Sequence, residues 1–109
     1  MMSEDVTWHR AADRAQVGPD EAISVTIGEE NVALCEVDGE VCAFNNICTH
    51  EYACLSDGFV DGDQIECPLH QARFHIPTGK ALTAPAEIAL RTYPTKVEAD
   101  EVFVGMPKK

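Results

Sequence analysis

Two short motifs that mix cysteine with histidine place the strongest constraint on this chain. The sequence reads Cys-Thr-His at 48–50 and Cys-Pro-Leu-His at 67–70, with sixteen residues between His50 and Cys67. Thiolates and imidazoles are the side chains that bind zinc and some iron–sulfur clusters. If the four side chains share one metal centre, the fold has to bring two loops together.

The mixture of ligand types within each motif favours iron over zinc. When two His replace two Cys on one iron of a [2Fe–2S] cluster, the result is a Rieske centre, and its potential rises from about −400 mV to roughly −150 to +300 mV. A closed zinc site of two Cys and two His is the alternative, but common zinc spacings pair Cys with Cys and His with His. We therefore predict one [2Fe–2S] cluster per chain.

The whole chain has the composition of one globular domain. It has 109 residues, of which 45% are hydrophobic and 25% are charged, both ordinary values. The first residues are acidic and unlike a signal peptide, and no apolar run reaches the eighteen residues of a membrane span. We expect a soluble, cytoplasmic protein without a membrane partner.

Acidic residues dominate the charge. Nineteen Asp and Glu against eight Lys and Arg give a formal net charge of −11. Nucleic acid is excluded as a partner, because its phosphates would be repelled. A protein partner with a positive docking patch suits this charge. An alternative interpretation is that the acidity only keeps the protein in solution.

Alternating and β-branched segments predict an all-β chain. We expect strands at 6–10, 22–27, 31–37, 40–45, 64–66, 73–76, 88–93, 97–98 and 102–104, one turn of helix within 11–18, and a frayed tail from 106. Asp38-Gly39 predicts a hairpin turn. In 88–93 the alternation would place Ile88, Leu90 and Thr92 on one face.

The run CPLHQARFHIPTGKAL at 67–82 resembles the soluble Rieske ferredoxins of bacterial multicomponent aromatic-ring dioxygenases. The Cys-Thr-His motif, the Asp38-Gly39 hairpin and the closing pattern from Tyr93-Pro94 to Val102 are similar too, so the likeness covers nearly the whole chain. It implies an antiparallel β-sandwich base with an inserted small β cluster-binding subdomain at about 45–84, within a single domain of 1–109.

The same resemblance implies a role for each ligand. Cys48 and Cys67 would hold the inner iron, and His50 and His70 would hold the outer iron at the protein tip. Leu69, Phe74 and Pro85 are candidates for an apolar shell that limits water near the cluster, or they could simply be core residues. The segment Thr83–Ala86 would be the proline loop on the cluster's third side.

The implied function is electron transfer without substrate turnover. A monomeric carrier would take single electrons from an NAD(P)H-dependent flavoprotein ferredoxin reductase to a terminal Rieske oxygenase. Only His9 and His75 remain after the cluster takes its ligands, too few for the two-His, one-carboxylate iron that activates oxygen. The alternatives are the small Rieske subunit of an assimilatory nitrite reductase or other soluble oxidoreductase, and a zinc-stabilised interaction module.

Three further features bear on the potential and on the remaining thiols. Ala72 and Phe74 stand where high-potential relatives have Ser and Tyr hydroxyl donors, which predicts a potential at the low end of the Rieske range. Leu69 stands where those relatives have the second-loop Cys of a disulfide, so Cys54 has no such partner. Cys35 and Cys42 are expected to be buried as small apolar residues.

Overall fold

The computed structural model describes residues 6–48, 53–68, 72–83 and 88–107. His50, Leu69, His70, Gln71 and Pro85 lie outside the described residues. In the described part of the chain, no helix is both long enough and apolar enough to cross a membrane.

The structure confirms the all-β prediction. The described residues form ten strands and two short 3₁₀ turns: β1 (Val6–Asp13), η1 (Arg14–Gln16), β2 (Ile23–Ile27), β3 (Glu30–Val37), β4 (Glu40–Asn45), η2 (Leu55–Asp57), β5 (Phe59–Asp61), β6 (Gln64–Glu66), β7 (Arg73–His75), β8 (Thr92–Tyr93), β9 (Thr95–Glu98) and β10 (Glu101–Pro107). All the strand pairs are antiparallel. The turn η1 lies where a turn of helix was predicted.

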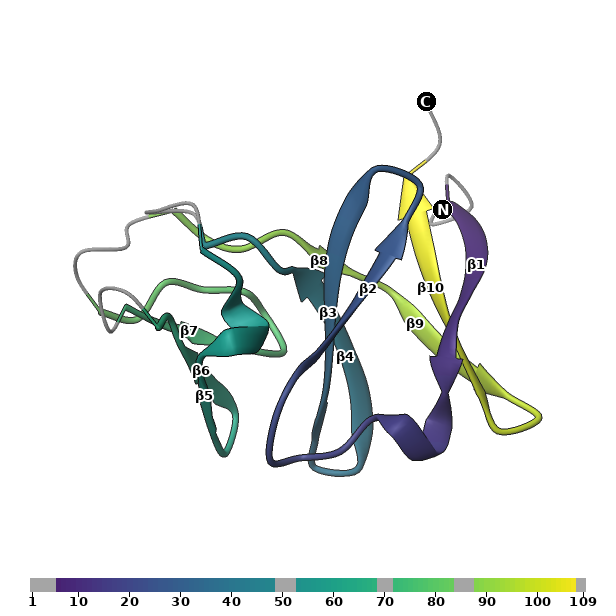
Figure 1. Ribbon diagram of the computed structural model, residues 1–109, viewed down its shortest axis with the longest axis horizontal. Helices are drawn as coiled ribbons and strands as arrows, with labels where there is room; N and C mark the ends of the chain where they lie inside the picture. Colours follow the sequence, from purple (N-terminus) through teal and green to yellow (C-terminus); the bar gives the residue numbers. More distant parts are fainter. Residues whose placement is uncertain (1–5, 49–52, 69–71, 84–87, 108–109) are drawn as a thin grey trace.

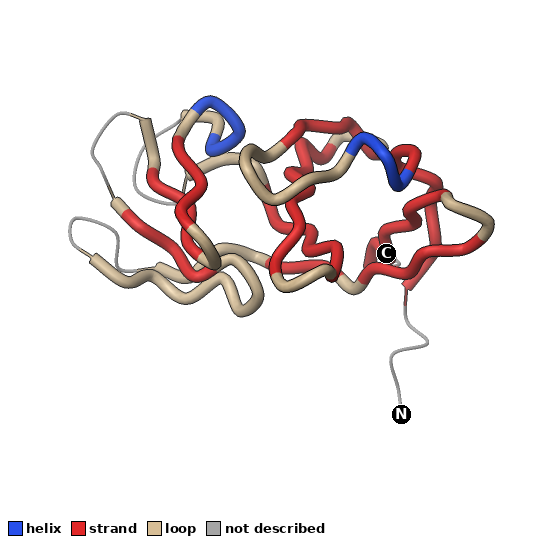
Figure 2. Tube along the Cα trace, turned by 90° about the horizontal axis from the view of Figure 1, so that it is seen from below, coloured by secondary structure: helices blue, strands red, loops and turns tan. Residues whose placement is uncertain are grey.

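The strands form three sheets that follow one another along the long axis (Figure 1). The sheet at one end has the order β1-β10-β9, and the middle sheet has the order β2-β3-β4-β8. The sheet at the other end, called the third sheet below, has the order β5-β6-β7. Figure 2 shows the third sheet and its loops as a lobe beside the other two sheets. The first two sheets form the sandwich base, and the third lies within the segment at 45–84 that we predict as the cluster-binding subdomain.

Both faces of β3 in the middle sheet are buried, because another sheet packs on each side. Val32 and Leu34 of β3 face the base core (Ala12, Val17, Ile27, Val32, Leu34, Val41, Ala43, Tyr93, Val102, Val104, Met106). Ala33 and Cys35 face the loop-side core (Ala22, Ala33, Cys35, Val37, Phe44, Cys48, Leu55, Ile65, Cys67, Ala72, Phe74, Ile76, Leu90). Successive side chains of a strand point to opposite faces, so β3 supports both cores.

Two-residue turns set the register of two hairpins. Asp38 and Gly39 have φ values of 53° and 83° and join β3 to β4, with Val37 opposite Glu40. Ala99 and Asp100 have φ values of 51° and 64° and join β9 to β10. Both turns occupy the left-handed region that matches the twist of a hairpin. The hairpin that Asp38-Gly39 predicted is therefore confirmed.

Two predictions about the C-terminal part were wrong. Met106 is not frayed, because it pairs with Thr7 of β1 and is buried in the base core. Residues 88–91 are not a strand, and Ile88 is 67% exposed. This segment instead crosses between the two cores, with Leu90 in the loop-side core and Tyr93 in the base core.

Candidate cluster site

Two buried cysteines stand at the starts of the two predicted ligand motifs. Cys48 comes three residues after the end of β4 and is 4% exposed, whereas Cys67 directly follows β6 and is fully buried. Both belong to the loop-side core. The fold therefore brings together the two thiols that the sequence predicted as ligands, although they are nineteen positions apart in the chain.

The two loops have matching closures. The backbone N–H of Cys48 donates to the carbonyl of Ala53 over 2.9 Å, and that of Cys67 donates to the carbonyl of Ala72 over 2.8 Å. Each bond joins the cysteine to the residue five positions further along. The bridge between Ile47 and Cys54 extends the closure of the first loop by one residue on each side. Both loops are thus closed at the cysteine itself.

Fully buried apolar side chains lie beneath the two cysteines. Leu55, Ile65 and Phe74 are each 0% exposed and share the loop-side core with Cys48 and Cys67. Phe74 faces inward from β7 and forms a bridge with Ala81. These side chains exclude water from the protein side of the thiols. Phe74 is therefore where an apolar shell residue was predicted, while Leu69 and Pro85 lie outside the described residues.

A close backbone contact ties the end of the first loop to the start of the second. A Cβ atom added at Gly58 would lie 1.9 Å from the carbonyl oxygen of Glu66 and 3.2 Å from that of Leu55. Real Cβ contacts are essentially never as short as the first of these. Glu66 immediately precedes Cys67, so the absence of a side chain at 58 allows the two cysteine loops to approach each other.

The outer face of the third sheet carries a charged network and exposed apolar side chains. The guanidinium of Arg73 lies 2.9 Å from a carboxylate oxygen of Glu66, 3.6 Å from one of Asp61 and 3.3 Å from the Gln64 amide oxygen. Phe59 pairs with Glu66 on the neighbouring strand and is 68% exposed. This face lies next to Cys67.

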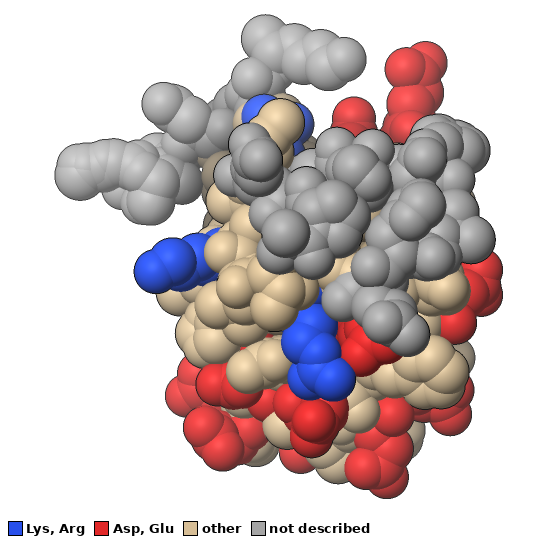
Figure 3. Space-filling model, turned by 90° about the vertical axis from the view of Figure 1, so that its left-hand side faces the viewer, with Lys and Arg blue, Asp and Glu red and all other residues tan. Residues whose placement is uncertain are grey.

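Acidic side chains gather on the lower part of the same end of the molecule (Figure 3). A groove of about 380 Å³ between the base and the turn from β5 to β6 is lined by four carboxylates, those of Asp20, Glu36, Asp38 and Asp63. A concentration of one sign of charge attracts a partner of the opposite sign. The described surface here therefore carries several acidic residues close together.

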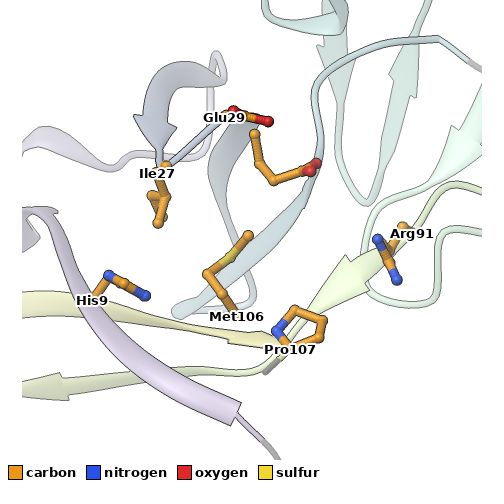
Figure 4. A pocket seen from close by; sticks show the side chains of 8 residues that line it. His9, Ile27, Glu29, Arg91, Met106 and Pro107 are labelled. Atoms are coloured by element: carbon orange, nitrogen blue, oxygen red, sulfur yellow. The ribbon is translucent and has the colours of Figure 1, made fainter. Parts of the chain in front are cut away.

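A second, larger cavity lies in the base and plays no part in the cysteine site. It has a volume of about 480 Å³, and its lining includes His9, Ile27, Glu29, Arg91 and Met106 (Figure 4). It lies between the ends of β1 and β10 and the turn from β2 to β3. His9 has an exposed side chain at this cavity.

The other predicted positions are placed as follows. His75 points away from Phe74, as expected of strand neighbours, and its ring nitrogens lie 2.8 Å from the Thr78 hydroxyl and 3.2 Å from an Asp63 carboxylate oxygen. Cys35 is fully buried, and burial raises the pKa of its thiol to about 11. Cys42 is half-buried, and burial raises the pKa of its thiol too.

Cys35, Cys42, Cys48 and Cys54 carry free thiols in the structure. The Sγ atom of Cys54 lies 3.8 Å from the side-chain amide nitrogen of Asn31. Among the described residues, no group of three or more His, Cys, Asp and Glu side chains is arranged to hold a metal ion. The predicted set of four ligands is not covered by that finding, because two of its members lie outside the described residues.

Buried thiols in paired loops above an apolar core suit a metal cluster, since thiolates are the usual protein ligands of iron–sulfur centres. The family model for the Rieske [2Fe-2S] domain matches residues 7–94. The chain belongs to this family, and its cofactor is a Rieske-type [2Fe–2S] cluster. The prediction of this cofactor is confirmed.

Individual relatives agree with the family assignment. The chain is 43% identical over 101 residues to the ferredoxin component of the naphthalene 1,2-dioxygenase system of Pseudomonas putida, covering 93% of this chain and 97% of the relative. Among solved structures it is similar to the Sphingomonas yanoikuyae B1 ferredoxin, with a TM-score of 0.88 and 38% identity over 93% of this chain and all of that one.

A third relative is one chain of the solved complex of reduced oxygenase and oxidized ferredoxin in carbazole 1,9a-dioxygenase. Its TM-score is 0.86 at 32% identity, and the match covers 94% of this chain and 95% of that one. The resemblance to Rieske ferredoxin components of dioxygenase systems is therefore confirmed.

Proposed function

We propose a ligand set for the cluster that consists of Cys48, His50, Cys67 and His70. The observation that carries the proposal is the pair of matched loops, each closed at a buried cysteine above one apolar core. The two thiolates would hold the inner iron, and the two imidazoles would hold the outer iron. Each histidine follows its cysteine by two or three residues, close enough for both to serve one centre.

The chain acts as an electron carrier without substrate turnover of its own. When bound, the Rieske cluster accepts and releases one electron at a time at a potential that its histidine ligands raise. The chain's own residues supply the surroundings. Leu55, Ile65 and Phe74 keep water from the buried side of the thiols, and Leu69 and Pro85 are proposed to extend that apolar shell.

The partners are a flavoprotein ferredoxin reductase and the terminal oxygenase of an aromatic-ring dioxygenase system. Two relatives support this step: one is named as a ferredoxin component of such a system, and another belongs to a complex of ferredoxin with oxygenase. The carrier works as a monomer, because a redox shuttle needs a small and weak interface that it can leave after each transfer. The acidic groove and the net charge of −11 favour basic docking surfaces.

Spectroscopy of the purified protein tests the ligand set. Dithionite reduction should give the low average g value of a histidine-ligated cluster. Cys48→Ser and Cys67→Ser should remove the visible absorption and the iron, whereas Cys42→Ser, in a thiol outside the set, should leave both unchanged. A colourless protein with one zinc ion would instead support the zinc-stabilised interaction module.

Reconstitution tests the partners. In an assay with the reductase and oxygenase of a naphthalene dioxygenase system, the chain should replace the native ferredoxin, and the rate should fall as salt rises. Failure to support turnover with any dioxygenase, together with permanent co-elution with another oxidoreductase in gel filtration, would contradict the proposal. A stable complex with a nitrite reductase would support that alternative.

The potential is proposed to lie at the low end of the Rieske range. Ala72 and Phe74 are fully buried beside Cys67 and carry no side-chain donor. Hydrogen bonds to the cluster sulfurs stabilise the added electron and raise the potential. Ala72→Ser and Phe74→Tyr should therefore each shift the midpoint potential upward in a redox titration, and unchanged potentials in both variants would contradict this explanation.

A further inference from the structure

Asn46 is a buried polar residue two positions before Cys48. It is 0% exposed, and among the described residues no other polar or charged residue is buried as it is. Burying an amide costs free energy unless its hydrogen bonds are made. The position of this amide beside a cysteine loop therefore points to a specific set of partners.

Every hydrogen-bonding group of Asn46 has a partner. Its side-chain oxygen accepts the backbone N–H of Ser56 over 2.8 Å, and its side-chain nitrogen donates to the Ser56 hydroxyl over 2.9 Å and to the side-chain oxygen of Asn31 over 3.1 Å. Its backbone N–H donates to the carbonyl of Asn31 over 2.8 Å, and its carbonyl accepts the N–H of Leu55 over 2.7 Å.

These bonds join both ends of the first cysteine loop to the base. Asn46 stands before the loop, Leu55 and Ser56 stand after it, and Asn31 belongs to β3 of the middle sheet. The next position is fixed as well, because the N–H of Ile47 donates to the side-chain oxygen of Asn45 over 2.9 Å. The backbone that leads into Cys48 is therefore held to β3.

The second cysteine loop needs no such device. Cys67 directly follows β6, and the last residue of that strand, Glu66, is paired with both Phe59 and Arg73. The ladder itself therefore positions Cys67. Cys48, in contrast, lies three residues beyond the end of β4, where the strand pairing continues as an isolated bridge between Ile47 and Cys54. The Asn46 amide supplies a further constraint.

We propose that Asn46 is a positioning residue for the cluster: its amide fixes the first loop on β3 so that the Cys48 thiol meets the site built around Cys67. The inference rests on the proposed role of Cys48 as a ligand. Removing a group that orients a metal ligand typically lowers metal affinity by about 10–100-fold. Asn46 orients Cys48 indirectly, because its amide holds the backbone before and after the first loop.

The test compares Asn46→Ala with Val104→Ala. Val104 is fully buried in the base core, far along the chain from either loop, so its truncation lowers stability without touching the site. Visible absorption measures the loss of the cluster to a chelator. The fluorescence of Trp8 measures unfolding of the base, because Trp8 is the only tryptophan and lies in β1. The EPR spectrum of the reduced protein reports the ligand geometry.

We expect Asn46→Ala to lose the cluster about tenfold faster than the wild type and to change the EPR line shape. Val104→Ala should lower the midpoint of the Trp8 unfolding transition by a similar amount. It should nevertheless keep the wild-type EPR spectrum and the wild-type rate of cluster loss. Ser56→Ala, which keeps the bond from its backbone N–H, should fall between the wild type and Asn46→Ala. If Asn46→Ala does not fold, Ser56→Ala against Val104→Ala decides the question.

Equal rates of cluster loss and unchanged spectra in Asn46→Ala and Val104→Ala would overturn the positioning role. The same holds if Ser56→Ala, used in place of an unfolded Asn46→Ala, retains the cluster as the wild type does. A wild-type protein without a histidine-ligated EPR signal would contradict the proposed ligand set instead. The two failures are therefore distinguishable.

Discussion

The base and the third sheet reach stability in different ways. The base contains strands of up to eight residues, such as β1 and β3, that enclose a core of β-branched and other apolar side chains. In the third sheet, β5, β6 and β7 have three residues each. Strands that short are at the lower limit of the usual range, so this sheet depends on what it packs against.

This difference shows which contacts hold the cysteine loops in place. The third sheet packs through the loop-side core onto β3 and β4, and the closures at Cys48 and Cys67 hold the loops. We therefore expect the base to fold around its own core, and the third sheet to need the base, the loop closures and the bound cluster together. Binding to the native state adds stability by mass action, and here it should act mainly on the third sheet.

Two leucines give the strongest test of this difference. Leu34 in the base core and Leu55 in the loop-side core are both fully buried, and Leu→Ala in a core costs about 2–5 kcal/mol. Leu34→Ala should lower the Trp8 unfolding transition. Leu55→Ala should mainly accelerate cluster loss, measured by visible absorption. If both variants shift both signals equally, the two regions unfold as one unit.

Gly58→Ala should separate the two cysteine loops. The new Cβ would meet the backbone carbonyl of Glu66 at 1.9 Å, which no side-chain rotation can relieve, so we expect about 3 kcal/mol, the upper end of the usual cost of overpacking. Cluster content per protein should fall steeply while the Trp8 transition changes little. Gly18→Ala is the matched control, because a Cβ atom added at Gly18 would have no neighbour within 4 Å. Comparable cluster loss in that control would refute the steric explanation.

The ion pairs of Arg73 provide a smaller comparison. Its side chain is 37% exposed, and its partners Glu66 and Asp61 are 19% and 82% exposed. Pairs with this exposure contribute about 0.2–1 kcal/mol. Arg73→Met should therefore accelerate cluster loss slightly at low salt and hardly at all at high salt. An effect that persists at high salt would indicate packing of the side chain rather than charge.

Sequence reasoning reached the cofactor and the fold class because both depend on local signals. The spacing of Cys48 to His50 and Cys67 to His70 indicates the cofactor, and alternation and turn residues indicate the strands. The crossing segment at 88–91 was missed because its alternation matches a strand equally well. Only the presence of two cores, unknown from the sequence, places Leu90 in one and Tyr93 in the other.

Asn46 was missed for a related reason. An asparagine at the end of a predicted strand is a common turn residue, and nothing local distinguishes Asn46 from its neighbour Asn45. The difference between them is tertiary, since Asn46 is enclosed by β3 and by the end of the loop, while Asn45 is half-buried. The Asn-Asn pair one residue ahead of the first motif was the available signal.

Cys35 allows the most specific test, because it lies on β3 between the two regions. Burial raises the pKa of its thiol from 9.0 to about 11, so between these values the folded state keeps a proton that the unfolded state releases. Stability from this group is complete below pH 9 and falls as the pH rises toward 11. The Trp8 unfolding midpoint of the wild type should therefore decline more steeply over this interval than that of Cys35→Ala. Parallel declines would show that the Cys35 thiol has the same pKa in the folded and unfolded states. The alkaline sensitivity would then come from another group, for example Cys42, because burial also raises the pKa of its thiol.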